Sequence, residues 1–273
     1  MRKEAVSLLG LAALILSIPL PYLSIKENRV AEGVRYTLAA LPGSTALIVG
    51  IAVVAVLAAF ILIPRMARFL AARAVIAALA PALFLLILQV GARGAMDTLG
   101  FAAGRAGPGV GFWAAIAGAY MVLYDALRRS ERGRLFRSLV GAGCLAAIAL
   151  ALVAGPAGTL GIVQEYANRT ERFWREVGAH LTLSGVSVLG ATVIGVPLGI
   201  LAFRSKRAEK PVFTITNGLQ TIPSLALFGL LIAPLAFLSH RFPFLRALGI
   251  RGVGNSPAII ALVLYGLLPV VRN

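Results

Sequence analysis

The sequence contains 273 residues, of which 59% are hydrophobic and only 13% are charged, and its mean hydropathy is +0.91. A soluble protein of this composition could not cover its surface with polar side chains, so a soluble globular fold is excluded and a membrane protein is indicated. The net charge of +16 fits basic loops held on the cytoplasmic side of a membrane better than it fits nucleic-acid binding.

Apolar segments long enough to cross a bilayer recur along the whole chain. A spanning helix needs about 20 mostly apolar residues, and eight segments qualify: 5–23, 44–63, 74–92, 109–125, 138–156, 177–203, 212–233 and 257–271. We therefore expect an all-α polytopic membrane protein with about eight transmembrane helices. The first segment follows Arg2 and Lys3 like a signal peptide, but Ser17–Pro21 offers no small-x-small cleavage site, so we expect it to be retained.

Loop charges predict the orientation of these helices. Basic residues are denser in the short loops that are cytoplasmic if the N-terminus is cytoplasmic, and acidic residues favour the other side. The most basic loop, 128–137, has two interpretations. It is a topology signal that touches lipid phosphate, or it is a docking surface for a cytoplasmic partner.

The first half of the chain predicts a hydrophobic extension. Residues 1–156 are expected to form about five helices with hardly any polar side chain inside them, followed by a periplasmic segment at 157–176. Asp125 is interpreted as an interfacial residue neutralised by Arg128 and Arg129. The glycine-rich stretch from Gly91 to Gly111 is expected to be an outer loop.

The helix expected at 177–203 carries a stripe of small or weakly polar residues. At helical spacing, His180, Ser184, Ser187, Ala191 and Gly195 share one face, which permits close approach of another helix. We predict that Gly195 and Gly199 pack against such a helix and that Pro197 between them favours a kink. His180 is expected to be an interfacial histidine rather than a proton relay.

The helix expected at 212–233 has the most informative polar face. Five polar residues fall on one side of it: Thr214, Asn217, Gln220, Thr221 and Ser224. Polar side chains in lipid require partners or water, so this face either lines a pathway or forms a polar seam with another helix. Asn217, Gln220, Thr221 and Ser224 are the candidate pathway residues, and Pro223 is a candidate kink beside them.

Several chemistries are missing from the sequence. It contains no phosphate-binding G-x-x-x-x-G-K-[ST] loop and no H-E-x-x-H motif, and its single cysteine, Cys144, cannot form an internal disulfide. No acidic residue lies near the middle of an expected span, as a proton- or sodium-coupled carrier would usually require. We therefore predict no catalytic residue, no metal site, no cofactor and no enzymatic activity.

Motifs in the second half resemble one transporter family. They are His180–Ser184, Ile194–Ile200, Leu219–Ile232, Leu248–Ile250 and Pro257–Asn273. Together they resemble the permease subunit of osmoprotectant ABC importers, the glycine betaine, choline and carnitine group. Gln164–Arg169 and the long apolar extension resemble the low-affinity glycine betaine branch of Gram-negative bacteria.

The resemblance implies a type I ABC importer permease in the bacterial inner membrane, with 177–273 as the N-terminal part of the permease domain. It implies four kinds of partner: a second permease subunit, cytoplasmic ATPases that hydrolyse ATP, a periplasmic substrate-binding protein and the lipid bilayer. The expected spans hold no clustered aromatic cage for a quaternary ammonium ion, so we expect the binding protein to select the substrate. Two alternatives stay open: import of another small solute such as an amino acid, or a non-transporting membrane scaffold.

Family members continue into a cytoplasmic loop with a Glu-Ala-Ala motif, which docks into the ATPase. This sequence stops at Asn273, where that loop would begin. We therefore expect the chain to be truncated before its coupling loop.

Overall fold

A computed structural model describes residues 4–101 and 103–273. The basic residues Arg2 and Lys3 lie outside this part of the chain. The chain divides into two compact units, unit 1 at 1–168 and unit 2 at 169–273. Seven of the described helices are long and apolar enough to cross a membrane, and the predicted all-α polytopic fold is confirmed.

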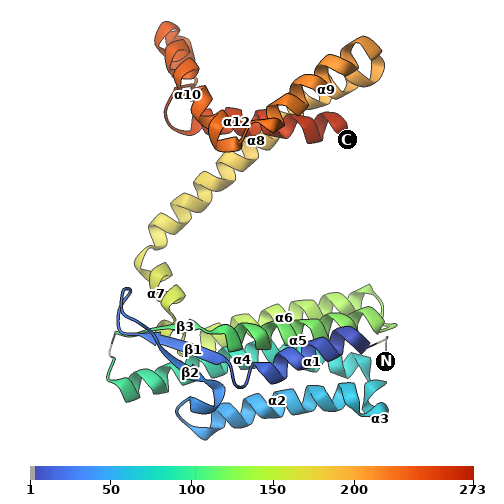
Figure 1. Cartoon of the computed structure of the whole chain (residues 1–273), viewed down its shortest axis with the longest axis vertical. Helices are drawn as coiled ribbons and strands as arrows, with labels where there is room; N and C mark the ends of the chain where they lie inside the picture. The colour runs from blue at the N-terminus through green and yellow to red at the C-terminus, as the bar shows by residue number, and fades with distance from the viewer. Residues whose placement is uncertain (1–3, 102) are drawn as a thin grey trace. The chain divides into compact units, whose positions relative to one another are not determined.

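Unit 1 is a helical bundle with a small sheet at one end (Figure 1). Its elements in chain order are α1 (Ala5–Leu16), β1 (Pro21–Lys26), β2 (Val34–Thr37), the 3-10 helix η2 (Leu38–Ala40), α2 (Ser44–Leu62), α3 (Pro64–Ala67), α4 (Leu70–Leu99), β3 (Arg105–Pro108), α5 (Val110–Arg129), α6 (Arg134–Ala154), the 3-10 helix η3 (Ala157–Thr159) and α7 (Gly161–Asn168). The sheet order is β2-β1-β3, with both neighbours antiparallel to β1.

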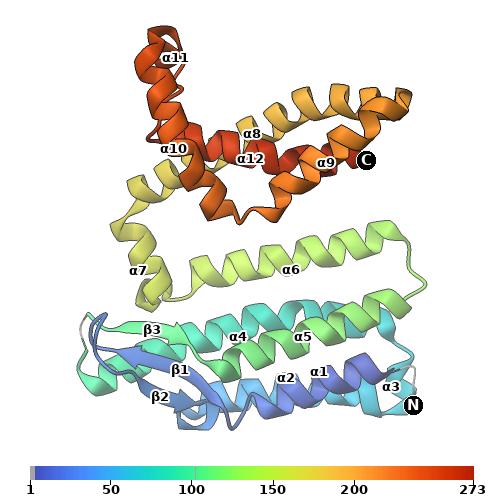
Figure 2. The same cartoon turned by 45° about the horizontal axis from the view of Figure 1, so that its top comes forward.

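The long helices of unit 1 run side by side, and α4 contacts α2, α5 and α6 (Figure 2). Its alanines, such as Ala77 and Ala92, are wholly buried and allow these helices to approach. The largest fully buried aliphatic and phenylalanine side chains of unit 1 come from four α-helices, β1 and η2: Leu14, Leu23, Ile25, Leu38, Leu57, Phe84, Leu88 and Val122.

The prediction of one helix over 5–23 is wrong. Helix α1 is only 12 residues long, because Pro19 and Pro21 disfavour helical backbone around them. The chain then becomes extended as β1, and Leu23 pairs with Pro108 of β3. Residues 5–22 nevertheless follow α5 antiparallel, from Ser7 beside Asp125 to Tyr22, whose carbonyl accepts from the Gly109 N–H.

The glycine-rich stretch that was expected to be an outer loop is partly helical. Gly91 and Gly94 belong to α4, which continues to Leu99 because this part of the helix packs against Leu41 and Pro42. Gly100 then ends the helix with a φ of 71°, a left-handed conformation that glycine adopts without strain.

Unit 2 contains α8 (Thr170–Arg204), α9 (Lys206–Thr221), α10 (Ser224–Arg241), α11 (Pro243–Ala247) and α12 (Asn255–Arg272). Helix α8 packs along α12, and contacts progress in the same direction on both: Gly190 meets Val263, and Gly195 meets Leu267 and Val270. The two helices therefore run parallel.

The apolar segment expected at 212–233 is interrupted beside Pro223, where the sequence predicts a kink. The segment breaks between α9 and α10 at Ile222 and Pro223. Proline has no N–H to donate and disfavours helical backbone at the preceding residue. Ile222 is accordingly extended, with φ −79° and ψ 126°.

Candidate functional site

The four candidate pathway residues lie around the break between α9 and α10. Asn217, Gln220 and Thr221 are in the last turns of α9, and Ser224 begins α10. All four side chains are exposed within this chain. The break therefore brings polar side chains and a non-helical stretch of backbone to the same place.

Tyr265 of α12 closes this break with two hydrogen bonds. Its hydroxyl donates to the carbonyl of Ile222, and its own carbonyl accepts from Gln220 Nε2 at 3.1 Å. A break in a membrane helix leaves carbonyls without helical partners, and the tyrosine satisfies one of them. Gln220 thus belongs to a seam between α9 and α12.

The hydroxyls beside the break bond within their own helix. Thr221 Oγ1 donates to the Gly218 carbonyl at 2.7 Å, and Thr216 Oγ1 donates to the Val212 carbonyl at 2.8 Å. Asn217 presents an amide at the same level, and an amide cannot be satisfied by the helix backbone as easily as a hydroxyl.

The structure places Gly195 and Gly199 of α8 against α12. A Cβ on Gly195 would come 2.8 Å from Val270 Cγ1, and one on Gly199 would come 3.1 Å from the Val271 carbonyl. Ser187 and Ala191 are buried on the same face, whereas His180 and Ser184 are exposed. Pro197 is exposed, and α8 continues through it as one helix of 35 residues.

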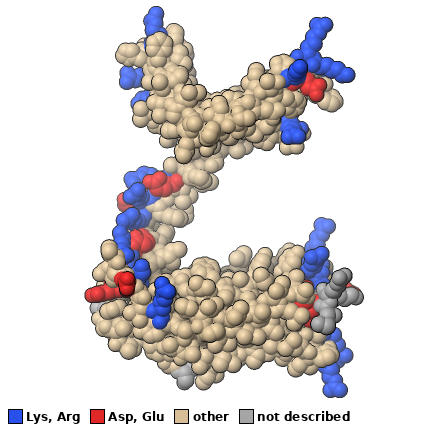
Figure 3. Space-filling view, viewed as in Figure 1, with Lys and Arg blue, Asp and Glu red and all other residues tan. Residues whose placement is uncertain are grey.

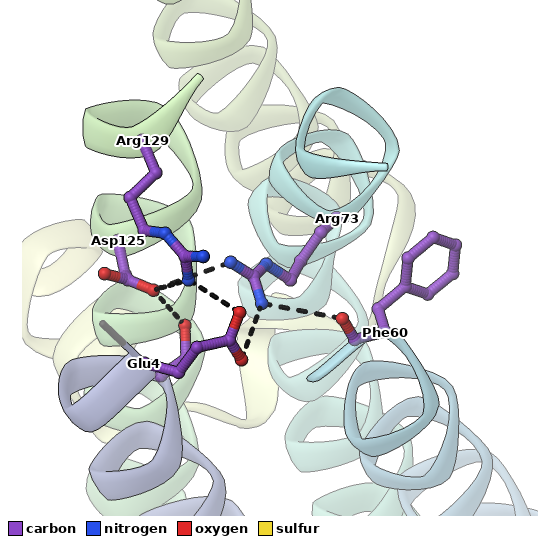
Figure 4. A network of polar contacts seen from close by, with 6 residues as sticks. Glu4, Phe60, Arg73, Asp125 and Arg129 are labelled. Carbon is purple, nitrogen blue, oxygen red and sulfur yellow. Dashed lines mark hydrogen bonds and ion pairs between the residues drawn. The ribbon is translucent and has the colours of Figure 1, made fainter. Parts of the chain in front are cut away.

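Unit 1 contains a largely buried charged cluster, of which the sequence predicted only the contact between Asp125 and Arg129 (Figure 4). Its members are Glu4, Ser7 and Arg73 together with Asp125 and Arg129 (hereafter the charged cluster). The guanidinium of Arg73 lies 3.6 Å from Glu4 Oε2 and 3.5 Å from Asp125 Oδ2. Arg129 Nη1 lies 2.7 Å from Glu4 Oε1 and 3.4 Å from Asp125 Oδ2. Two positive and two negative side chains therefore compensate one another.

Two neutral groups also bond to this cluster. Ser7 Oγ donates to Asp125 Oδ2 at 2.6 Å, and Arg73 Nη1 donates to the Phe60 carbonyl at 3.5 Å. The cluster thus joins the beginning of α1, the end of α2, the first turn of α4 and the last turns of α5. Its position and its zero net charge make it a structural joint among four helices.

Two sequence interpretations are corrected here. The first half does carry polar side chains within helices: Arg73 and Gln89 of α4 are fully buried, and Gln89 Nε2 donates to the Ala151 carbonyl at 3.2 Å. Asp125 is buried, with 6% exposed, and Arg129 neutralises it as expected, but its second partner is Arg73 rather than Arg128. The spacing of four residues between Asp125 and Arg129 was the available signal, whereas Arg73 resembled a loop residue because α3 and α4 are separated by a short turn.

A second group of charges lies at the sheet end of unit 1. Glu165 of α7 accepts hydrogen bonds from Arg105 and from Arg29, the latter at 2.6 Å. The hydrogen bond from Arg105, together with the positive charges of both arginines, holds the pKa of the Glu165 carboxyl below its ordinary value. Figure 3 shows that charged side chains gather at the two ends of this unit, as expected for a bundle whose middle faces lipid.

Comparison with known proteins places these features in a family. Residues 2–163 match the family described as "ABC transporter permease YehY, N-terminal domain". No solved structure matches the chain.

Three curated relatives match a shorter part of the chain. The osmoprotectant import permease protein OsmW of Salmonella typhimurium is 44% identical over 34% of this chain and 39% of its own length. The choline transport system permease protein OpuBD of Bacillus subtilis is 36% identical over 40% of this chain and 41% of its own length. The carnitine transport permease protein OpuCD of Listeria monocytogenes is 34% identical over 38% of this chain and 37% of its own length.

The chain thus spans less than half the length of these relatives. The family match, in contrast, covers more than half of the chain and most of unit 1. With its membrane-spanning helices and this match, the chain belongs to the ABC transporter permease YehY family.

Proposed function

We propose that this chain is a transmembrane permease subunit of an ATP-driven importer and forms part of the translocation pathway for a quaternary-ammonium osmolyte such as glycine betaine. The observation that carries this proposal is the similarity to permeases named for osmoprotectant, choline and carnitine transport. The low-affinity glycine betaine branch, suggested by Gln164–Arg169, is part of the same proposal.

The proposal includes the partners of such an importer. Cytoplasmic ATPase subunits would supply energy, a periplasmic binding protein would deliver and select the substrate, and a second permease subunit, identical or different, would complete the pathway. The chain would lie in the bacterial inner membrane with its N-terminus in the cytoplasm. In this arrangement 1–156 is the hydrophobic extension, 157–176 is periplasmic and 177–273 opens the permease domain.

Uptake of radiolabelled glycine betaine, choline and carnitine tests the substrate class. Cells whose gene for this chain is disrupted should lose uptake of at least one of the three, and a plasmid copy of the gene should restore it. Unchanged uptake of all three would overturn the osmolyte proposal. Loss of amino-acid uptake instead would favour the same permease role with another small solute.

Co-purification with the ATPase subunit tests the permease role separately. The tagged full-length product of the gene, with the coupling loop expected after Asn273, should retain the ATPase encoded with it, in detergent, without added substrate. Failure of this binding together with normal uptake in the disrupted strain would favour a non-transporting scaffold.

The polar break supports a location for the pathway. Non-helical backbone at membrane depth is tolerated where protein or a water-filled cavity surrounds it, and Asn217, Gln220, Thr221 and Ser224 surround this break. Pro223 fixes its position, while Gly195, Pro197 and Gly199 belong to the α8 segment that packs on α12. Because Gln220 already bonds to Tyr265, Asn217 is the residue for which contact with the solute is best supported.

Substituting Asn217 tests this location. In the chromosomal gene, Asn217→Leu should reduce the maximal uptake rate several-fold while the amount of protein in the membrane stays unchanged. The matched control is Thr216→Val, which removes a buried hydroxyl whose hydrogen bond is to its own helix, and uptake should persist. Normal uptake by Asn217→Leu would exclude it from the pathway without affecting the substrate-class test.

A further inference from the structure

A groove lies between α5 and α6 at the end of unit 1 that carries the charged cluster. Its volume is about 420 Å³, and its lining residues are Tyr120, Leu123, Tyr124, Leu127, Arg128, Arg137 and Gly141. Arg128 is in the last turn of α5 and Arg137 is in the first turn of α6. Both arginines therefore lie at the same end of the groove, and apolar and aromatic side chains line the rest.

The basic end of the groove favours an anion. The first turn of α6 contains Arg134 and Arg137 and no acidic residue, and no side chain caps it at Gly133. Positive side chains oppose the helix dipole at this terminus, whereas a bound anion complements it. Arg137 uses one N–H to reach the Ser130 carbonyl at 3.3 Å, and its guanidinium has further donors for a second acceptor.

Among the described residues, no neighbouring acidic side chain supplies the negative charge that Arg128 and Arg137 favour. Arg129, next to Arg128, is committed to Glu4 and Asp125. The acidic residue of the connecting loop, Glu131, is exposed and is not part of the groove lining. Arg128 and Arg137 thus face the groove with two positive charges.

The remaining wall favours an alkyl chain. Tyr120 and Tyr124 are 65% and 48% exposed, and α6 is largely exposed along its length. A Cβ added to Gly141 would meet nothing within 4 Å, so the groove is open beside it. In a membrane-spanning unit an exposed apolar surface of this kind is suited to contact lipid, and basic pockets between transmembrane helices are known to bind anionic head groups.

We propose that this groove binds one anionic phospholipid, such as phosphatidylglycerol, whose phosphate lies between Arg128 and Arg137 and whose acyl chain follows the groove toward Tyr120 and Gly141. A free phosphate would use the arginines but not the apolar wall. A zwitterionic lipid would use the wall but would bring its own positive charge to the arginines. An anionic lipid complements both the arginines and the apolar wall. Its binding does not depend on the proposed transport function.

Native mass spectrometry of the full chain in mild detergent tests the head-group contact. With phosphatidylglycerol, we expect one lipid to be retained at collision energies that remove phosphatidylcholine. In Arg128→Gln/Arg137→Gln this retention should fall roughly tenfold, because charge-assisted bidentate hydrogen bonds are lost. The control Arg65→Gln/Arg68→Gln removes the same charge from α3 and the turn after it, outside the groove lining, and should leave retention unchanged.

A second pair of variants tests the acyl-chain contact without changing charge. Gly141→Leu should occupy the groove and weaken retention several-fold, whereas Gly143→Leu on the same helix, which also meets nothing within 4 Å, should not. Thermal unfolding in lipid-free detergent identifies variants that fail to fold. If the glutamine pair fails to fold, Arg128→Lys/Arg137→Lys replaces it. The lysine pair keeps the charge but not the bidentate geometry, so it should weaken lipid retention less than the glutamine pair would.

Three results would overturn the proposal. Equal retention of both lipids would indicate unspecific lipid contact, and full displacement of the lipid by inorganic phosphate would identify a free-phosphate site. Unchanged retention in Gly141→Leu would show that the acyl chain does not occupy the groove.

Discussion

Arg73 illustrates, at the scale of single residues, how a charge is accommodated inside this membrane protein. Its side chain is completely buried, and Glu4 and Asp125 provide the opposing charges. Removing one partner of a buried ion pair leaves an uncompensated charge, which costs about 3–5 kcal/mol. The cluster therefore contributes to stability mainly because each of its four charged side chains has an oppositely charged partner.

We predict that Arg73→Met destabilises the protein by about 3–5 kcal/mol, because it leaves Glu4 and Asp125 with one arginine between them. The exposed Arg65→Met should change the free energy of unfolding by less than about 0.5 kcal/mol. Thermal or denaturant unfolding in detergent measures both. Equal stability of the two variants would mean that the cluster has no net role.

Glu165 predicts a pH dependence at the sheet end. Since Arg105 and Arg29 lower the pKa of this carboxyl in the folded protein, its contribution to stability is present above the pKa of the unfolded chain. This contribution is lost as the pH falls through the folded pKa. Melting curves between pH 7 and pH 3 should therefore show a smaller acid-induced decrease for Glu165→Gln than for the wild type. The same substitution at the exposed Glu27 should leave the slope unchanged, and equal slopes in all three proteins would contradict the prediction.

At the scale of secondary-structure elements, glycines allow pairs of helices to pack closely. A Cβ on Gly118 of α5 would come 2.6 Å from the Gly10 carbonyl of α1, and one on Gly10 would come 2.8 Å from the Gly118 carbonyl. Both obstacles are backbone atoms, which cannot move aside as a flexible side chain can. The contact between α1 and α5 consequently depends on the absence of side chains at this point.

Alanine substitutions should have opposite effects at two glycines of unit 1. Gly118→Ala should destabilise the protein by about 1–3 kcal/mol through overpacking. Gly143→Ala, in open space on α6, should be neutral or stabilise it by about 0.5–1 kcal/mol through helix propensity. Melting temperatures of the two variants relative to wild type measure the sign. A Gly118→Ala protein as stable as Gly143→Ala would exclude close packing of α1 on α5.

Hydropathy predicted which segments form membrane-spanning helices but not where every helix begins and ends. Seven spanning helices correspond to predicted segments, because length and apolar composition dominate that outcome. Pro19 and Pro21 interrupt a segment whose apolar content suggested a continuous helix, whereas the break at Pro223 follows the predicted kink. The three-stranded sheet depends on pairing among three separate segments, which periodicity within a single segment does not reveal. The charged cluster was missed for the same reason, since Arg73 and Asp125 are 52 positions apart and meet only through the packing of α4 and α5.

The whole molecule should have one orientation, which we infer from its loop charges. The end of unit 1 that carries the charged cluster is expected in the cytoplasm and the sheet end in the periplasm. In a Cys144→Ser background, Glu27→Cys should react with a membrane-impermeant maleimide added to spheroplasts, whereas Glu131→Cys should react only after lysis. The reverse pattern would invert the orientation, and labelling of both positions in intact spheroplasts would contradict a single topology.

The order of the charged cluster along the chain has a consequence for biosynthesis. Glu4 is translated first, Arg73 second, Asp125 third and Arg129 last, so negative and positive charges alternate as the ribosome proceeds. Arg73 lies in the first turn of α4 and Arg129 is the last residue of α5, and each arginine, when it is synthesised, finds a carboxylate already made. At no stage of translation does the nascent cluster hold more than one uncompensated charge.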